Sequence, residues 1–435
     1  MSQTAKSTTG TAPTTTVAGR VDDVRASLHR SLSGTPGRLR ILALLTVAVS
    51  LIFAIGAYSA FGTADAALRR AGENAAQLVR IQAIHTNLVR ADADATNSFL
   101  VGGLEPASQR ASYTSSMDQA SALIAQAAKA QPADGPALGA LNTSVLTYAG
   151  LIEQARATNR QALPVGAQYL KLASSGLRSD ALPILDELVK ANDARVRAEF
   201  DTARGASTAL ITSGVLALLV LVGGMVWLSR RTHRYVNAPL AAATVAILVT
   251  LVVGVIVLAS VGSRVATVRD GSYAATLATA TSRIAAFDAK SNESLTLIAR
   301  GSGTAFEKTW QSSSKVVTDQ SAAAGRLSSD ATGLSGLWKS YADTHVKIRA
   351  ADDDGQWDSA VQLAIGSGPA SANATFNAFD TGSGAALTSS SRSASDSLDA
   401  PRTWLVLIGW LGLLVGIAAA ISAWWGVSLR LEEYR

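Results

Sequence analysis

Four long runs of apolar residues organise this chain. They cover residues 41–61, 208–228, 238–261 and 404–427, and each holds 21 to 24 residues without a single charge. A helix of about 20 apolar residues crosses the roughly 30 Å hydrocarbon core of a bilayer. The pattern therefore predicts four transmembrane helices. The second and third form a hairpin, because only residues 229–237 separate them.

The segment between the first two runs, residues 62–207, has the periodicity of packed helices. From Ala67 onward, apolar side chains recur at alternating steps of four and three, which is the spacing of a helix seam in a bundle. No break occurs before Gly102, so we expect the first transmembrane helix and the helix after it to form one rod. A short helical piece is predicted at residues 167–173, and a last helix should begin near Asp180.

The segment between the last two runs, residues 262–403, repeats this plan. A shift of 196 positions places Asp92 on Asp288, and a shift of 193 places Tyr148 on Tyr341. The copy keeps the direction of the original, unlike the inverted repeats of many secondary transporters. The sequence therefore predicts a tandem duplication in an all-α membrane protein.

Charge predicts the orientation of this protein. Residues 1–40 carry six Lys and Arg against two Asp and Glu, and residues 229–237 carry three Arg and no acidic residue. Positive charge close to the spans marks the cytoplasmic side, so we place both termini, including residues 428–435, and the bend inside the cell. The fold expected is four transmembrane helices with two tandem exported helical bundles. Residues 1–40 are too polar to fold alone.

The composition favours no catalytic or transport chemistry. The chain has no cysteine, and its four histidines are scattered, so neither thiol chemistry nor a metal site is indicated. The apolar runs contain no ionisable residue, although ion-coupled transport usually needs one. We therefore expect no enzymatic activity, no cofactor and no bound metal. A nucleic-acid partner is not expected either, because the excess of basic residues is confined to the short segments near the membrane.

Two aspartates stand out in the predicted bundles. Asp92 and Asp288 both fall on the inward seam of the first helix of their segment. A carboxylate in a seam costs stability unless it is paired or hydrated. Either these residues fix the helix register or lie on a solvated flank, or they form a polar layer that rearranges during signal transmission or contacts a ligand.

Two further groups are candidates for partner contacts. Asn159, Arg160 and Tyr169 flank the turn at Pro164–Gly166, and loops of this kind often present binding residues. The alternative is a capped helix end with Tyr169 packed on the bundle. The bend between the second and third spans offers four basic side chains to a cytoplasmic partner: Arg230, Arg231, His233 and Arg234.

The residues around this turn also carry a family resemblance. Residues 157–170 read ATNRQALPVGAQYL, which is similar to the Asn-Arg…Pro-x-Gly…Tyr-Leu segment of the actinobacterial GlnX-type sensors. The resemblance implies a four-span plasma-membrane sensor that works with a secreted solute-binding lipoprotein for acidic amino acids and with the cytosolic serine/threonine protein kinase G. In architecture, the bundles also resemble the four-helix sensor domains of bacterial chemoreceptors. They are compatible with a homodimer.

A second class of function fits the same topology. A membrane subunit that transmits force for an ABC-type ATPase or a cell-wall hydrolase complex would also have exported helical domains and no catalysis. An ATPase would need a cytoplasmic coupling helix, and only residues 21–33 or the bend could provide one. The identity of the cytoplasmic partner separates the two interpretations.

Overall fold

The computed structural model describes residues 35–101, 105–161, 163–232 and 237–432. Every regular element in this part of the chain is helical, which confirms the predicted all-α class. The elements of the N-terminal half are α2 (Thr35–Leu100), α3 (Ala107–Ala130), η1 (Pro132–Asp134), α4 (Gly135–Arg160), α5 (Val165–Gly176), η2 (Leu177–Ala181), α6 (Leu182–Gly205) and α7 (Ser207–Thr232).

The C-terminal half has a similar order of elements. They are α8 (Ala238–Val268), η3 (Arg269–Tyr273), α9 (Ala274–Ile298), α10 (Thr304–Leu327), η4 (Ser329–Ala331), α11 (Leu334–Asp353), α12 (Trp357–Ile365), α13 (Ala372–Asp399) and α14 (Arg402–Glu432). Both halves contain a long first helix, a second helix, a short 3₁₀ turn, a third helix, a short helix and a last long helical stretch. The π-helical turn differs in place: η2 precedes the last stretch in the N-terminal half, and η3 interrupts the first helix in the C-terminal half. This order agrees with the predicted duplication, which remains a prediction.

Four helices of the described chain are long and apolar enough to cross a membrane, so the chain is a multi-pass membrane protein. They are Gly37–Leu100, Val165–Arg230, Ala238–Ile298 and Ala372–Leu429. The predicted rod is confirmed, because α2 continues as one helix from Thr35 to Leu100.

The predicted break before Asp180 is wrong. The helix that begins at Val165 continues through η2, a π-helical turn at Leu177–Ala181. Proline lacks an N–H and crowds the preceding turn of an α-helix. Pro183 is the second residue after this wider turn, and π-turns of this kind insert one extra residue without ending the helix.

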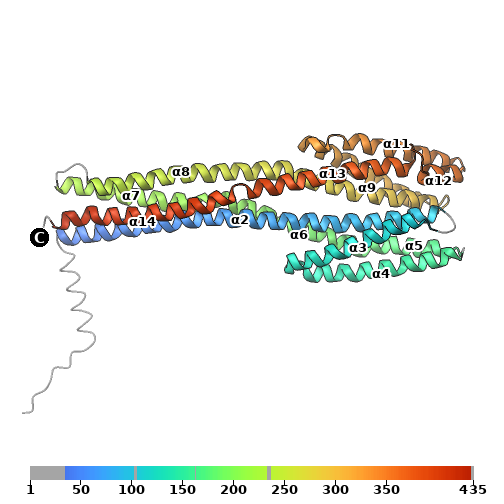
Figure 1. The fold of residues 1–435 in the computed structure, drawn as a ribbon, viewed down its shortest axis with the longest axis horizontal. Coiled ribbons are helices and arrows are strands. Elements are labelled where there is room, and N and C mark those ends of the chain that lie inside the picture. The colour runs from blue at the N-terminus through green and yellow to red at the C-terminus, as the bar shows by residue number, and fades with distance from the viewer. Residues whose placement is uncertain (1–34, 102–104, 162, 233–236, 433–435) are drawn as a thin grey trace, which may run out of the picture. The chain divides into compact units, whose positions relative to one another are not determined.

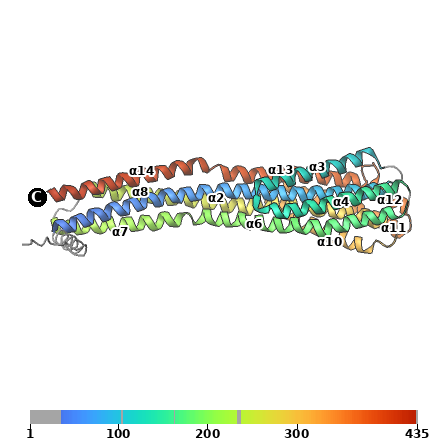
Figure 2. The same ribbon diagram turned by 90° about the horizontal axis from the view of Figure 1, so that it is seen from below.

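The chain divides into two compact units. Unit 1 contains residues up to Gly62, residues 206–258 and residues from Val406 onward, and unit 2 contains residues 63–205 and 259–405. In unit 1 the apolar parts of α2, α7, α8 and α14 run side by side (Figures 1 and 2).

Small residues bring the helices of unit 1 close together. A Cβ atom added at Gly416 of α14 would lie 2.7 Å from the Cα of Ala54 on α2, and one added at Gly412 would lie 3.0 Å from the Cβ of Ala57. Close backbone approach over small residues is a common way for helices to associate in a bilayer. Large apolar side chains such as Leu219 remain exposed, as lipid-facing positions require.

Unit 2 contains two hydrophobic cores that share α2. Leu88 of α2 belongs to the core formed with α3 to α6, whereas Val89 and Ala93 belong to the core formed with α9 to α13. Side chains on opposite faces of one helix can serve two cores only if the helix is covered all round. The two predicted bundles therefore pack as one unit, with α2 between their cores.

Candidate functional site

Asp92 is a fully buried carboxylate with several hydrogen-bond donors around it. Its side chain is 1% exposed. Ser174 Oγ donates to its Oδ1 at 2.5 Å, Ser291 Oγ donates to its Oδ2 at 2.6 Å, and Arg178 Nη1 lies 3.1 Å from the same Oδ2. Charge-assisted hydrogen bonds of this kind offset the loss of hydration. Asp92 is therefore a paired interior charge and not a solvated flank residue.

Arg178 connects Asp92 to the second aspartate. Its Nε donates to Asp288 Oδ1 at 2.9 Å, and its Nη2 donates to Ser291 Oγ at 3.0 Å. Asp288 also accepts from Ser313 Oγ at 2.7 Å. Arg178 comes from η2 in the N-terminal half, whereas Asp288 and Ser291 come from α9 in the C-terminal half. The guanidinium thus forms a charged bridge between the two halves of unit 2.

Electrostatics keep this bridge charged. Burial lowers the pKa of Arg178, but Asp92 and Asp288 outweigh this effect and raise it above its usual value. Burial also lowers the pKa of His85 to about 4, although Asp288 acts in the opposite direction. At neutral pH the Arg178 guanidinium is therefore charged, whereas the imidazole of His85 nearby is neutral.

The predicted partner-binding residues are only partly brought together. Arg160 is exposed and Asn159 half-buried at the end of α4, and both line a small cavity of about 170 Å³ with Arg156 and Glu105. Tyr169 instead packs against the core of the N-terminal half. A partner surface at Asn159 and Arg160 remains a prediction, and Tyr169 has the packing role considered as its alternative.

The basic bend is described only in part. Arg230 is exposed in α7. The backbone of Arg231 is helical, but its side chain, like His233 and Arg234, lies outside the described residues. A cytoplasmic contact at these positions stays a prediction.

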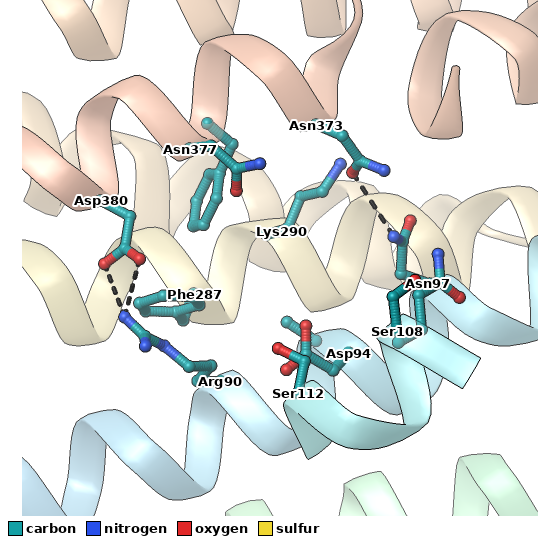
Figure 3. Close-up of a pocket in the computed structure, with 13 residues that line it drawn as sticks. Arg90, Asp94, Asn97, Ser108, Ser112, Phe287, Lys290, Asn373, Asn377 and Asp380 are labelled. Carbon is teal, nitrogen blue, oxygen red and sulfur yellow. Dashed lines mark hydrogen bonds and ion pairs between the residues drawn. The ribbon is translucent and has the colours of Figure 1, made fainter. Parts of the chain in front are cut away.

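A second polar site, which the sequence analysis missed, lies between the two halves (Figure 3). A cavity of about 270 Å³ is lined by residues of α2, α3, α9 and α13. The side chains at this cavity are mostly polar: Arg90, Asp94, Asn97, Ser108, Gln109, Ser112, Lys290, Asn373, Asn377 and Asp380, with Phe287 and Phe376 among the apolar ones.

Most charges at this cavity have partners. Arg90 Nη2 lies 2.7 Å from both carboxylate oxygens of Asp380, and Arg283 Nη2 also donates to Asp380 Oδ1 at 2.7 Å. Lys290 Nζ lies 2.7 Å from Glu293 Oε1. Burial would raise the pKa of Glu293, but Lys290 and a hydrogen bond from His345 dominate and lower it to about 2. These pairs fix the cations that face the cavity.

Asp94 is the exception. It forms no ion pair within the described part of the chain, and its side chain lies beside Ser112 (Figure 3). Burial raises the pKa of Asp94 to about 6, although Ser112 and Arg90 act in the opposite direction. Among the described residues, no group of three His, Asp or Glu side chains is placed to hold a metal ion.

The sequence spacing of the cavity residues on α2 could have indicated that they lie together. Arg90, Asp94 and Asn97 recur at steps of four and three, which places them on one face of a helix. That face is adjacent to the seam that contains Asp92, and a lone polar helix face usually indicates solvent exposure. Only the C-terminal half, packed over it, turns this face into the wall of a cavity.

Comparison with known proteins gives one family. Residues 67–201, which cover the N-terminal half of unit 2, match the family model described as actinobacterial sensor domain. No curated protein and no solved structure matches the chain. The matched segment contains Asp92, Asp94 and Arg178, and the match supports a sensing role for a chain of actinobacterial type.

Replacing Asp94 tests its electrostatic state. Because the folded-state pKa of Asp94 is raised to about 6, its ionised form destabilises the folded protein above that pH, and the penalty disappears as the pH falls toward 4. The other charged groups at this cavity have partners: Arg90 contacts Asp380, and Lys290 contacts Glu293. Asp94→Asn should therefore stabilise the protein by about 1–3 kcal/mol at pH 7.5, measured by thermal unfolding, with a smaller gain at pH 5.

The matched control is Asp118→Asn, because Asp118 is exposed on α3. It should change stability by no more than about 0.5 kcal/mol at either pH. A loss of stability in Asp94→Asn at pH 7.5 would show that the ionised carboxylate is needed for folding.

Proposed function

We propose that this chain is a transmembrane signal relay. In this proposal, unit 2 lies outside the cell, where a secreted binding lipoprotein loaded with an acidic amino acid docks on it. The short cytoplasmic segments control a cytosolic serine/threonine kinase, and the chain itself catalyses no reaction. The match of residues 67–201 to a sensor domain supports the sensing part of this proposal.

The continuity of the helices is the observation that carries the proposal. The four candidate spans belong to helical stretches of 58 to 66 residues, which are interrupted at most by short turns such as those at Ala206 and Ala400–Pro401. Each of these stretches also contributes residues to unit 2. At a rise of 1.5 Å per residue, a helix of this size is about 90 Å long. A small axial or rotational shift at one end can pass along such a helix, as in shear-type changes between packed helices.

The ion pairs of Arg178 provide a contact that can differ between two packing arrangements of the two halves of unit 2. Arg178 of the N-terminal half is held by Asp288 of the C-terminal half at 2.9 Å. A buried ion pair is favourable only in good geometry, and a broken one is costly. The two halves should therefore move between discrete arrangements, each with its own set of partners for Arg178.

Photo-crosslinking combined with substitution of Arg178 tests this proposal in intact cells. A crosslinking residue at Arg160 should capture the binding protein, and one at Arg230 should capture the kinase. Arg178→Gln, which removes both ion pairs of the bridge, should leave the two captures in place. Phosphorylation by the captured kinase, measured on its substrates, should no longer respond to the acidic amino acid.

Two further variants make the result interpretable. Asp288→Asn removes only one ion pair of Arg178 and should weaken the response with a smaller loss of stability. Lys190→Gln is the control, because Lys190 is exposed and pairs only with Glu187 on the same helix. An unchanged response in Arg178→Gln would contradict the relay. Capture of an ATPase or a cell-wall hydrolase would instead favour a force-transmitting subunit.

A further inference from the structure

The cavity between the two halves collects unpartnered polar atoms. Eleven buried side-chain atoms have no hydrogen-bond partner among the described residues, and four of them belong to residues that line this one cavity. They are Arg90 Nε, Asp94 Oδ2, Asn97 Oδ1 and Gln109 Oε1. Because buried polar atoms are almost always paired, such a concentration indicates a site that a ligand fills.

The four atoms form a defined chemical pattern. Asp94 Oδ2, Asn97 Oδ1 and Gln109 Oε1 are hydrogen-bond acceptors, and Arg90 Nε–H is a donor. Asn97 is only 9% exposed, and its amide nitrogen already donates to Asn373 Oδ1 at 3.4 Å (Figure 3). The free amide oxygen is therefore held in a fixed position next to the cavity.

Water alone does not satisfy this pattern. A water molecule can donate to the amide oxygens of Asn97 and Gln109, but it brings no counter-ion for Asp94. The two cationic side chains that line the cavity are already engaged, because Arg90 contacts Asp380 and Lys290 contacts Glu293. A positively charged donor complements Asp94 better than water does.

We infer that this cavity binds a small zwitterion of the free amino-acid class. An ammonium group has three N–H donors, which match the three unpartnered acceptors on Asp94, Asn97 and Gln109. A carboxylate on the same molecule accepts from Arg90 Nε. The two ends of such a molecule thus offer groups of the correct kind and charge for the unpartnered atoms of the residues that line the cavity.

The size and walls of the cavity agree with a ligand of this class. Its volume of about 270 Å³ lies just below the range of about 300–1,000 Å³ typical of small-molecule sites. The guanidinium of Arg90 lies 4.8 Å from the ring centroid of Phe287, and this contact together with Asp380 orients its Nε. Few rotamers need to be fixed on binding, which favours affinity.

The position of the cavity gives the ligand a way to act on the protein. Asp94 and Gln109 belong to the N-terminal half, whereas Asp380 and Lys290 belong to the C-terminal half. A ligand that fills the space between them favours the arrangement in which the halves are together. This inference goes beyond the proposed relay, because binding to this chain requires neither a binding protein nor a kinase.

Calorimetric titration of the full-length chain in lipid nanodiscs tests the inference. The probes are the standard L-amino acids, each added alone, with ethylamine and propionate as ligands that carry only one of the two charged groups. We expect at least one amino acid to bind, and neither ethylamine nor propionate to bind comparably. Asp94→Asn should weaken the affinity about 10- to 100-fold, as expected for loss of a charge-assisted hydrogen bond.

The control variant is again Asp118→Asn on the exposed face of α3, which should bind like the wild type. A loss of affinity in Asp94→Asn cannot be attributed to unfolding, because this variant is expected to be more stable than the wild type. Absence of amino-acid binding to the wild type, equal binding of ethylamine, or full affinity in Asp94→Asn would each overturn the inference. Since no partner protein is present, these outcomes are independent of the proposed relay.

Discussion

The burial of the Asp92 carboxylate is the constraint on which unit 2 depends. A charge that is 1% exposed is tolerated only where donors and a counter-charge surround it. Those donors come from both halves, since Ser174 and Arg178 belong to the N-terminal half and Ser291 to the C-terminal half. Separating the halves would leave Asp92 with an incomplete set of partners, so the carboxylate links the packing of one half to that of the other.

The same logic explains the composition of α9. This helix is buried on nearly all sides, yet it contains Lys290, Ser291 and Glu293 among its buried residues. Each has a partner: Lys290 and Glu293 pair with each other at 2.7 Å, and Ser291 donates to Asp92. Because these polar side chains of α9 are buried, its neighbouring helices must both exclude water and offer polar partners. Ser291 and Asp288 of α9 contact Asp92 and Arg178 of the N-terminal half, and these contacts make the pairing of the halves specific.

The sequence predicted the long-period features well. The four apolar runs, the continuous helix from Thr35 to Leu100 and the inward position of Asp92 all follow from periodicity and the absence of charge. These features depend on neighbours within one helix, which a sequence displays directly.

The contacts between halves were not predictable in this way. Arg178 lies 110 positions from Asp288, in a π-helical turn where the sequence suggested a break between helices. Asp94 and Asn97 lie on a helix face that reads as solvent-exposed until α13 and α9 cover it. The sequence contains the residues of both sites, but their pairing depends on how two separate cores share one helix.

A double-mutant cycle between Arg178 and Asp288 tests most directly whether a charged bridge couples the two halves. The free energy of unfolding would be measured for the full-length wild type in detergent, for Arg178→Gln, for Asp288→Asn and for the double variant. Contact across a partly buried ion pair predicts a coupling energy of about 1–3 kcal/mol, with the double variant less destabilised than the sum of the single ones. Additive effects, with a coupling below about 0.5 kcal/mol, would show that the two halves are not joined by this bridge.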